Sequence, residues 1–562
     1  MRGQWLRKDL LVSETSPHPF RVFLVNPAPS AERIKFSFIT PRFLPVLAAV
    51  TPEEDFIKGL RLIDQAVEPF PLDEVQPGDL VGIGIHTFNA LHGYNLAAKV
   101  QALGATIIIG GPHVSVFPDE AAKHGDAVVT GDAEVVWGQA LRDYAAGQLQ
   151  PRYNGGRVDP EFFSPARWDL MTLDRYLVAS VQTVRGCPKS CSFCSVWVQD
   201  GRSPRLRTND AIITELKALY SAGFRLIMFA DDNFYPYTPQ DIENAHNEEL
   251  RGRLEAGMQA RYELLERLAD EIPSDMYFFT QITMEVADDP KYMKAMKKGR
   301  IGGALIGIET ITEEGLKATN KGFNSSGADL ARRLETIRKE AFSYIMGAFI
   351  FGIETDTQES MDQTIEFARD CGVALVQFIP LTPLPGTVDF QMMRKDRKAL
   401  KLKDVNYDYW LDPDHPRILY HHPLLKEEEI LDGIERAWRD FYSMTSTLKR
   451  CLRFGMFKDL RNFVAYFVVC QGMLSRYRRY GISADSAVRG TKHKIANVLG
   501  KMALSLLKRS PEAAWSAQGT NGASQTHEAA KPAAGLQKNS PAMSPAAVDP
   551  DRSAESQESI AS

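Results

Sequence analysis

The sequence predicts an α/β protein in two successive parts, a Rossmann-like parallel-sheet domain followed by a partial (β/α) barrel. Short apolar, β-rich runs recur along the first 390 residues, and most of them break into glycine and polar residues. Amphipathic, helix-like stretches separate these runs. Repeated alternation of strand, turn and helix indicates parallel sheets with helices packed on their faces.

Length and composition fit a protein of several folded domains. The chain has 562 residues, of which 44% are hydrophobic and 24% charged, and its net charge is −5. This length suggests roughly three or four domains, and the charge gives no general case for nucleic acid. The N-terminal stretch lacks the apolar core of a secretory signal, and no apolar run approaches the ~20 residues of a membrane span. Six cysteines in this length fit a reducing cytoplasm, so we expect a cytoplasmic protein without a nucleic-acid partner.

The first predicted domain covers residues 1–150. Its apolar runs lie at residues 20–27, 79–88, 105–113 and 126–134. Ligands of such sheets bind at the carboxyl ends of the strands. The residues at those ends include Thr87, Gly110, Gly111, Gly131 and Glu134. Tight turns between strand and helix explain the glycines equally well, so a structural role remains open for them.

The second predicted domain covers residues 181–395, after a linker at 151–180 that contains proline and glycine. Its β-like runs are 176–186, 225–234, 276–283, 303–310, 343–354 and 373–387. Six such runs with helices between them suit a full or partial barrel, whose active site lies at the carboxyl ends of the strands. The segment VRGCPKSCSFCSVW follows the first of these strands. It is therefore expected on the functional face of the barrel.

The C-terminal part divides into two regions. Residues 396–509 look mainly helical, and basic residues greatly outnumber acidic ones between 445 and 509. This region could lie on an anionic membrane surface, where each Lys or Arg contributes about 1 kcal/mol, or form a helical lid with a solvated basic face. Residues 510–562 are rich in Ala, Ser, Pro and Gln, which predicts a disordered tail.

Three cysteines, Cys187, Cys191 and Cys194, lie within eight residues of one another. A structural zinc site normally takes four ligands, and no fourth cysteine is near in sequence. A redox CxxC pair would not need Cys187. An iron–sulfur cluster is normally held by four thiolates. Three thiolates would leave one iron open to bind and activate a substrate, as catalytic zinc sites keep a free position.

The pattern CxxxCxxC, with Phe193 just before the last cysteine, resembles the radical S-adenosylmethionine (radical SAM) family. The resemblance implies that the three thiolates bind three irons of a [4Fe–4S] cluster. The fourth iron would chelate the methionyl amine and carboxylate of S-adenosylmethionine. An electron, supplied by a donor such as flavodoxin or ferredoxin, would cleave the S–C5′ bond to a 5′-deoxyadenosyl radical that abstracts hydrogen from an unactivated carbon.

The same resemblance assigns cofactor contacts along the barrel. The candidates are Asp231, Asp232 and Asn233 in ADDNF, Glu309 in GIET, and Gly352 and Glu354 in GAFIFGIETDT. ADDNF stands where the family contacts the methionyl amine, and Glu309 stands where it contacts ribose or the amino acid. Each has a structural alternative, because the aspartates could cap a helix and Glu354 could be a solvated turn residue.

Residues 82–134 resemble the cobalamin-binding domain of one large radical SAM subclass, including its GGPH and G(D/E)AE motifs. The sequence has no Asp-x-His-x-x-Gly stretch, so no histidine is assigned as a lower ligand to cobalt. Residues 1–186 contain no cysteine, which excludes a methylthiotransferase domain with a second cluster. The cofactors implied are one [4Fe–4S] cluster, S-adenosylmethionine and cobalamin.

The chemistry favoured is methyl transfer from methylcobalamin to a substrate carbon radical, with a second S-adenosylmethionine remethylating cobalt. The basic C-terminal region favours a lipid, isoprenoid-like or other apolar small-molecule substrate and a peripheral position at the inner face of the membrane. Relatives that have lost cobalamin, or that close rings or couple carbons, leave two alternatives within the same chemistry. A zinc-stabilised, nucleotide-binding scaffold protein is the alternative from another class.

Overall fold

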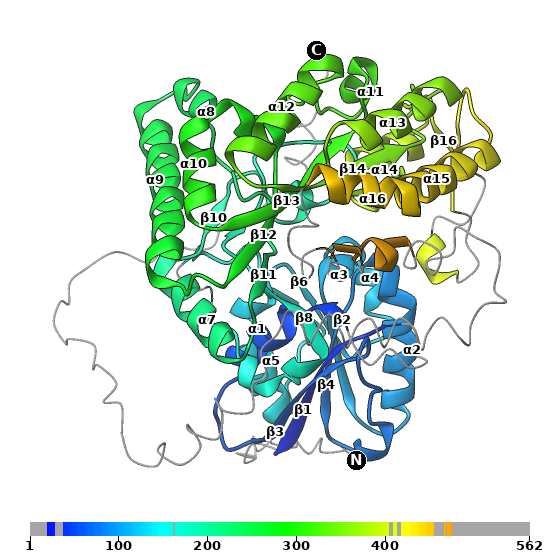
Figure 1. Ribbon diagram of the computed structural model, residues 1–562. Coiled ribbons are helices and arrows are strands. Elements are labelled where there is room, and N and C mark those ends of the chain that lie inside the picture. The colour runs from blue at the N-terminus through cyan, green and yellow to red at the C-terminus, as the bar shows by residue number, and fades with distance from the viewer. Residues whose placement is uncertain are drawn as a thin grey trace, which may run out of the picture. The chain divides into compact units, whose positions relative to one another are not determined.

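The computed structural model describes residues 19–28, 37–160, 163, 165–403, 408–412, 417–454, 463, 466–467 and 469–474. These residues belong to one compact unit, Met1–Ala514, which is shown in Figure 1. The predicted tail at 510–562 and most of the basic region after residue 474 lie outside the described residues.

The N-terminal sheet is parallel throughout and has the strand order β3-β1-β4-β5-β6-β7. Its strands are β1 (Phe20–Asn26), β3 (Ile57–Asp64), β4 (Leu80–Gly84), β5 (Thr106–Gly110), β6 (Ala127–Thr130) and β7 (Arg152–Asn154). Strand β1 lies at the topological switch point of the sheet, because β3 is on one side of it and β4 on the other. Strands β4, β5 and β6 are neighbours, so their carboxyl ends meet along one edge.

Helices cover both faces of this sheet. Helices α2 (Ala90–Gln101), α3 (Pro112–Val116) and α4 (Pro118–Ala121) pack on one face, with Phe23 and Val25 of β1. Helices α1 (Phe43–Ala49) and α5 (Trp137–Ala145) pack on the other, with Val22 and Leu24. Successive residues of a strand point to opposite faces, so a nearly continuous apolar run such as FRVFLV fills both cores. Figure 1 shows the two helix layers on either side of the strands.

The second sheet is a curled, parallel half-barrel with the order β15-β14-β13-β12-β11-β8-β2. Its strands are β2 (Ser37–Ile39), β8 (Tyr176–Val181), β11 (Leu226–Phe229), β12 (Tyr277–Ile282), β13 (Ile301–Glu309), β14 (Tyr344–Phe351) and β15 (Leu375–Pro380). Apart from β2, these strands stand in sequence order, and each coincides with a run predicted as a barrel strand. The α/β fold class predicted from the sequence is therefore confirmed.

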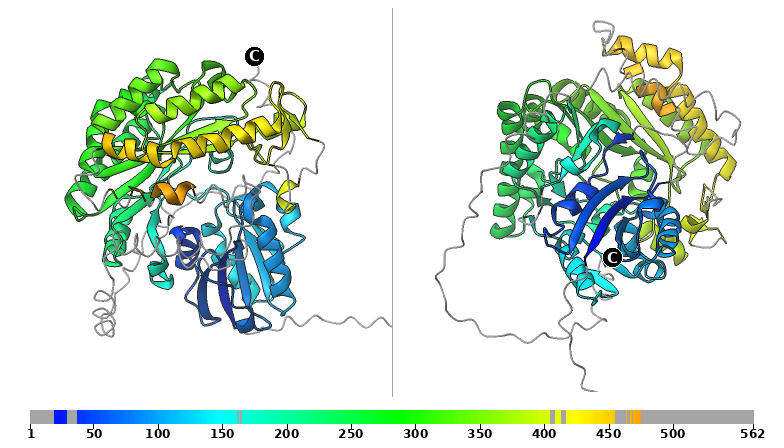
Figure 2. Two further views of the ribbon diagram at one scale, coloured as in Figure 1. Left: turned by 45° about the vertical axis from the view of Figure 1, so that its right-hand side comes forward. Right: turned by 90° about the horizontal axis from the view of Figure 1, so that it is seen from below.

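The helices of the barrel share one large core with its strands, and Figure 2 shows them along the outside of the curled sheet. They are α7 (Asn209–Ser221), α8 (Pro239–Glu243), α9 (Glu248–Glu271), α10 (Pro290–Lys298), α11 (Glu313–Ala318), α12 (Gly327–Glu340), α13 (Gln358–Asp370) and α14 (Val388–Arg394). Local sequence starts several of them. Asp289 accepts a hydrogen bond from the Tyr292 backbone N–H, and Pro290 occupies the first turn of α10, as expected of a helix N-terminus.

The remaining described elements are two strand pairs, three helices and several 3₁₀ turns. They are the antiparallel pairs β9 (Val184–Arg185) with β10 (Arg205–Leu206) and β16 (Lys401–Leu402) with β17 (Tyr420–His421), the helices α6 (Val196–Gln199), α15 (Glu427–Phe441) and α16 (Met444–Arg453), and the 3₁₀ turns η1 (Leu72–Glu74), η2 (Thr87–Asn89), η3 (Ala133–Val135), η5 (Trp168–Leu170), η6 (Leu173–Arg175), η7 (Met284–Asp288) and η8 (Tyr409–Leu411). The region predicted as mainly helical after residue 396 thus also contains a small strand pair.

Neither half of the molecule is built from one continuous stretch of chain. Strand β2, from the first 150 residues, pairs with β8 of the barrel sheet. In return, Tyr409, Trp410 and Leu419, from beyond the barrel, pack into the core of the N-terminal sheet. Contacts thus cross the domain boundaries drawn from the sequence in both directions. Those boundaries remain predictions. No described helix has both the length and the apolar character needed to cross a membrane.

Candidate functional site

The three clustered cysteines lie in the loop of a narrow hairpin at the carboxyl end of β8. Strands β9 and β10 form the neck of this hairpin, and Cys187 N–H donates to the carbonyl of Gly201 across it (3.1 Å). Gly186 has φ +94, and a Cβ there would lie 3.1 Å from the carbonyl oxygens of Asp200 and Gly201. Only glycine tolerates this combination easily, which explains the glycine just before the first cysteine.

Other barrel elements hold the cysteine loop in place. Ser192 N–H donates to the carbonyl of Thr319, and Ser192 O accepts from the N–H of Asp389, both at 3.0 Å. The Asn320 amide donates to the carbonyl of Ser190 (2.8 Å), and the Trp197 indole donates to the carbonyl of Cys191 (2.9 Å). The loop is therefore fixed by the segments that follow β13 and β15, as a preorganised site requires.

The three thiols are close enough to influence one another. All six cysteines of the chain are free, and Cys191 is buried while Cys187 and Cys194 are half-buried. Burial, together with the neighbouring thiols, raises the pKa of Cys187 to about 11 and that of Cys191 to about 12. A bound metal deprotonates such thiols outright. These pKa values therefore apply to the cysteine loop without a metal.

The described residues contain no group of three His, Cys, Asp or Glu side chains gathered to hold a single metal ion. A [4Fe–4S] cluster instead takes its thiolates on different irons. The donor set, three cysteines from one loop, fits the cluster that the sequence predicts at Cys187, Cys191 and Cys194.

A buried ion pair stands beside the thiols. Lys321 Nζ lies 2.7 Å from Glu309 Oε1, and both side chains are exposed by less than a tenth. Burial alone would lower the pKa of Lys321, but Glu309 and the Cys191 thiol raise it. Burial raises the pKa of Cys191 and Cys194, and the Lys321 ammonium offsets part of that rise. Glu309 was predicted from the sequence as a cofactor contact, whereas Lys321 was not.

Two local features make room for this pair at the end of β13. Glu309 adopts a left-handed backbone with φ +66, which is uncommon for a residue with a side chain. A Cβ at Gly307 would collide with the carboxylate of Glu309 and the ammonium of Lys321. A side chain at the glycine of GIET would therefore have to displace the charged ends of these two side chains.

The three polar residues after β11 differ in what their side chains contact. Asp231 is fully engaged, because it accepts the N–H groups of Thr183 (2.5 Å) and Val184 (3.0 Å) and the Thr183 hydroxyl. Asp232 accepts the N–H of Gly186 (2.6 Å), and burial together with the Asp200 carboxylate raises the pKa of Asp232 to about 7. Asp231 thus supports the strand that leads to the cysteines, while Asp232 touches their loop directly.

Buried polar atoms without a hydrogen-bond partner among the described residues follow four consecutive barrel strands. Besides the Ser192 hydroxyl in the cysteine loop, they include Asn233 Nδ2 after β11, Thr283 Oγ1 and Glu285 Oε2 after β12, Asn324 Oδ1 beside the end of β13 and Thr355 Oγ1 after β14. An unsatisfied buried polar group costs about 1–3 kcal/mol. Their position at the functional end of the barrel fits a polar ligand such as S-adenosylmethionine.

The end of β14 is a tightly bonded turn. Gly352 has φ +86, and the Asp356 carboxylate accepts the N–H groups of Gly352 (2.8 Å) and Ile353 (3.1 Å). Burial raises the pKa of Asp356 to about 6. Glu354, the residue predicted from the sequence, is half-buried in this turn, where its charge acts on His422.

The N-terminal candidates gather at one sheet edge, as predicted. Thr87 follows β4 and its hydroxyl lies 3.3 Å from His113 Nδ1, while Gly110 ends β5. Gly111 has φ +109 and packs against the backbone of Ile85, and Gly131, after β6, has φ +68 and packs against the backbone of Gly156. Both glycines are needed where two backbones meet closely. The His113 ring is buried, and its Nε2 lies 3.0 Å from Glu120.

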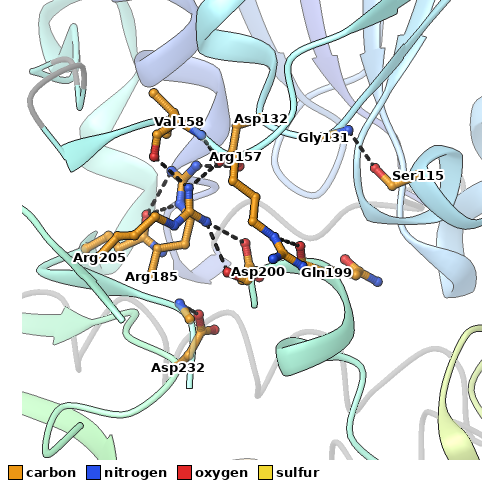
Figure 3. A network of polar contacts seen from close by, with 12 residues as sticks. Ser115, Gly131, Asp132, Arg157, Val158, Arg185, Gln199, Asp200, Arg205 and Asp232 are labelled. Carbon is orange, nitrogen blue, oxygen red and sulfur yellow. Dashed lines mark hydrogen bonds and ion pairs between the residues drawn. The ribbon is translucent and has the colours of Figure 1, made fainter. Parts of the chain in front are cut away.

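Glu134 does not stand free at this edge. Its Oε1 lies 2.9 Å from Arg185 Nη2, in the neck of the cysteine hairpin. Figure 3 shows the polar network around this contact. Lys321, Arg185 and Arg205 are charged residues of the site that sequence reasoning missed, because each is a single charged residue whose partner lies elsewhere in the chain and no local pattern signals it. Asp132 lies in the GDAE motif, but it was not predicted as a contact.

Comparison with known proteins places this architecture. Residues 181–368 match the Radical SAM superfamily. The chain is 26% identical over 360 residues to bacteriochlorophyllide d C-8(2)-methyltransferase of Chlorobaculum tepidum, covering 63% of this chain and 75% of that protein. It is 24% identical over 389 residues to hopanoid C-2 methylase of Rhodopseudomonas palustris, covering 67% of this chain and 69% of that protein.

Among solved structures, one similar chain is TsrM from Kitasatospora setae, a methyltransferase determined with cobalamin and a [4Fe–4S] cluster bound. The TM-score is 0.59 at 14% identity, and the match covers 83% of this chain and 100% of that chain. The two chains therefore share their fold from the N-terminal sheet through the half-barrel.

Proposed function

Since the chain belongs to the radical SAM superfamily, we propose that it is a cobalamin-dependent methyltransferase acting on an unactivated carbon. The observation that carries the proposal is the three-cysteine hairpin at the carboxyl end of the barrel strands. It faces strand ends whose buried polar atoms have no partner among the described residues. The N-terminal sheet, whose fold is shared with a cobalamin-bound relative, supports the second cofactor.

Cys187, Cys191 and Cys194 would hold a [4Fe–4S] cluster through three irons. When bound, the cluster and cobalamin supply, respectively, the electron that cleaves S-adenosylmethionine and the methyl group that reaches the substrate. The residues of the chain bind and orient these groups. Lys321, with its ammonium buried beside two of the thiols, would pair with the carboxylate of the methionyl group.

The strand ends would hold the rest of S-adenosylmethionine. Asn233 Nδ2 is a buried donor without a partner among the described residues, and Thr283 and Thr355 offer buried hydroxyls. Glu309 keeps Lys321 charged and in place. Asn233, Thr283 and Thr355 come from three different strand ends. A ligand that made hydrogen bonds to all three would therefore be fixed in orientation.

The carboxyl edge of β4, β5 and β6 would hold the corrinoid. Gly111 and Gly131 have positive φ and place no side chain at this edge. His113 is engaged through both ring nitrogens, by Thr87 and Glu120. A corrinoid at this edge would therefore be held without a bond from His113 to cobalt.

The proposal is tested by anaerobic purification and reconstitution of the full chain, with iron, cobalt and zinc counted together. We expect about four irons per chain, bound cobalamin, and 5′-deoxyadenosine release from S-adenosylmethionine under reducing conditions. Cys187→Ala, Cys191→Ala and Cys194→Ala should each lose iron and this cleavage. Cys371→Ala, which removes a half-buried cysteine far from the loop, is the matched control and should retain both.

The outcomes separate the alternatives. Stoichiometric zinc without cleavage of S-adenosylmethionine would overturn the proposal in favour of a zinc-stabilised scaffold. Iron and cleavage without cobalt, after growth with added cobalamin, would select a radical enzyme that has lost the corrinoid. Label from the methyl group of S-adenosylmethionine that never reaches a product would favour ring closure or carbon coupling.

For the substrate, we propose an apolar polycyclic molecule of lipid or tetrapyrrole type. The support is that two similar proteins are named for a bacteriochlorophyllide and for a hopanoid. Lipid and pigment profiles of a gene deletion should show the loss of one methylated compound and the build-up of its precursor. The precursor should be lighter by one CH₂ group, about 14 Da. Unchanged profiles of both classes would count against this substrate class.

Two partners belong to the proposal. An acidic one-electron donor such as flavodoxin or ferredoxin would reduce the cluster. A peripheral contact with the inner face of the membrane is supported by α16, where Met444, Leu448 and Leu452 are exposed on one stripe of the helix.

A further inference from the structure

The neck of the cysteine hairpin carries two arginines in direct opposition. Arg185 of β9 and Arg205 of β10 are cross-strand partners in the antiparallel pair. Like charges at such positions destabilise the pairing of two strands, and a two-stranded ribbon is marginally stable on its own. Within the hairpin, the Asp200 carboxylate reaches Arg205 Nη2 only at 3.8 Å. A closer negative charge has to come from elsewhere in the molecule.

That charge comes from the turn after β6 in the N-terminal sheet. Asp132 Oδ1 lies 2.6 Å from Arg185 Nη1, and its Oδ2 lies 2.7 Å from Arg205 Nη1. One carboxylate thus bridges both arginines, and Figure 3 shows Asp132 together with Arg185 and Arg205. Glu134, two residues further on, adds a second contact to Arg185 at 2.9 Å.

The bridging carboxylate is itself held firmly. Asp132 Oδ2 accepts the N–H of Val158 (2.8 Å), and a Cβ at Gly155 would collide with the carbonyl oxygen of Asp132. Arg205 also donates to the carbonyl of Val158 (2.7 Å). The segment after β7 therefore packs against the turn and closes the network on the N-terminal side.

All four charged side chains are exposed by 14% or less. Buried charge pairs lose little to solvent screening, and removing one partner leaves the other uncompensated. A surface ion pair would contribute little to position, but this network is largely out of water. The network stabilises the protein only while the cysteine hairpin and the N-terminal turn keep their positions relative to each other.

We propose that Asp132, Glu134, Arg185 and Arg205 form a neck clamp that positions the cysteine loop against the N-terminal sheet. Asp132 is its central positioning residue and acts on the cysteines through the two arginines. Arg185 is two residues from Cys187, and Gly131 begins the turn that contains Asp132. The clamp thus sets how far the cysteine loop, which would hold the cluster, stands from the edge of β4, β5 and β6.

This role differs from the one predicted for the GDAE motif from the sequence, where Glu134 was a cofactor contact. The positional role rests on the geometry alone. Its importance for catalysis rests on the proposed function, because two cofactors in different halves of the molecule must reach one substrate.

The clamp is tested by hydrogen exchange of the full chain in its iron-free form, which does not depend on the proposed function. Asp132→Asn keeps the shape of the side chain but removes the charge between the arginines. Backbone amides in the loop 186–204 should then exchange about tenfold faster. Arg205→Gln added to Asp132→Asn should bring the exchange back toward the wild-type rate, because one of the two repelling charges is gone.

A matched control is Asp79→Asn. Asp79 is also buried, takes a bidentate contact from one arginine, Arg21 (3.0 and 2.5 Å), and accepts the N–H of Gln76 (2.8 Å), all within the N-terminal sheet domain. Asp79→Asn should leave exchange in the loop unchanged. If Asp132→Asn does not fold, Glu134→Gln, which leaves Arg185 with one carboxylate, should give a smaller increase in the same amides.

A spectroscopic measurement follows in the reconstituted protein. The reduced cluster of Asp132→Asn should show an altered electron paramagnetic resonance signal on addition of S-adenosylmethionine, whereas that of Asp79→Asn should match the wild type. Wild-type exchange in Asp132→Asn, equal acceleration in Asp79→Asn, or further acceleration on adding Arg205→Gln would each overturn the clamp. Absence of any cluster would instead overturn the proposed function and leave the exchange result standing.

Discussion

At the scale of single residues, the site depends on charges that are buried and paired rather than exposed. Glu309 and Lys321 form one such pair beside the thiols, and Asp132 serves two arginines in the neck clamp. In both cases the charged group would be costly to bury alone. The partner makes the burial possible, and it also fixes where the charge stands relative to the cysteines.

Lys321→Met tests the first of these pairs. The substitution leaves the Glu309 carboxylate buried without its counter-ion, and breaking a buried pair in this way costs about 3–5 kcal/mol of unfolding free energy. Denaturant unfolding of the iron-free chain measures the loss. The control is Lys317→Met, which removes an exposed lysine from its pair with Glu313 (2.7 Å) and should leave stability unchanged. Equal stability of the two variants would show that the Glu309–Lys321 pair is not structurally required.

Asp356 gives stability a specific pH dependence. Its carboxyl has an ordinary pKa of 3.8, and burial raises the pKa of the folded form to about 6. Between these values the folded state holds a proton that the unfolded state has released, so the free energy of unfolding falls as pH rises. Asp356→Asn should remove this dependence, worth at most about 3 kcal/mol.

The measurement compares the unfolding free energies of wild type and Asp356→Asn at pH 4 and pH 7. The difference between the two proteins isolates this carboxyl from the others that titrate in the same range. A difference that does not change with pH would mean that Asp356 titrates at its ordinary value when folded.

The residue-level predictions divide according to how local their signal is. Cys187, Cys191 and Cys194 were predicted as cluster ligands because their spacing is a local pattern, and the structure places all three in one braced loop. Lys321 stands 12 residues from its partner Glu309, and Arg185 stands 53 residues from Asp132. A single charged residue carries no sign of a partner at that separation. Glu134 belongs to a local motif and was predicted as a cofactor contact, and the structure pairs its carboxylate with Arg185.

At the scale of elements, strands formed by continuous apolar runs were predicted, whereas the eight-residue β3, whose apolar residues are interrupted, and the shortest strands were not. β13 and β14 span nine and eight residues and are buried along most of their length. β2 has three residues and β16 two, and both depend on a partner strand far away in sequence. Strand propensity cannot identify strands of two or three residues, because pairing with a distant strand determines whether they form.

Helix α16 refines the basic C-terminal region predicted to approach a membrane. Met444, Leu448 and Leu452 recur every four residues and are 56%, 38% and 68% exposed. Lys449 is exposed next to this stripe, whereas Arg450 points inward and donates to the Tyr466 hydroxyl (2.9 Å) and the carbonyl of Phe441 (2.7 Å). Not every basic residue of the region is therefore available to lipid.

Leu448→Glu combined with Leu452→Glu tests the membrane contact. Burying one leucine in lipid contributes about 1.5–3 kcal/mol, so the doubly substituted chain should bind vesicles containing anionic phosphatidylglycerol at least about tenfold more weakly. Co-sedimentation of the full chain measures this. Leu424→Glu, at a 61% exposed leucine outside α16, is the control and should bind as the wild type does. Equal binding of all three proteins would exclude the α16 stripe as the contact.

At the scale of the whole molecule, Glu215 joins the two halves. Its carboxylate, on α7 of the barrel, accepts from Arg42 (2.6 Å) at the start of α1, from Arg207 and from the Trp168 indole (2.8 Å). Arg42 belongs to the N-terminal half, and Glu215 is almost fully buried. One carboxylate therefore satisfies three donors from three separate parts of the chain.

Glu215→Gln should destabilise both halves together. The change leaves two arginines buried without a counter-ion, at a cost of about 3–5 kcal/mol. Scanning calorimetry should show the whole transition moved to lower temperature, with faster hydrogen exchange in both β4 and β13. Glu54→Gln, which breaks the half-exposed pair of Glu54 with Arg142 (2.7 Å) in the N-terminal half, should change the unfolding free energy by less than about 1 kcal/mol. A shift confined to the barrel would show that the halves unfold independently.

Strand β2 has a practical consequence for recombining this protein with its relatives. Its three residues cover the outer edge of β8 and so occupy hydrogen-bonding groups that would otherwise stand open at the border of the half-barrel. A chimera that exchanged the whole N-terminal module at residue 150 would carry this cover away and expose an edge prone to pairing with another chain. Grafts should therefore keep Ser37–Ile39 with the recipient barrel, or import a segment that can replace it.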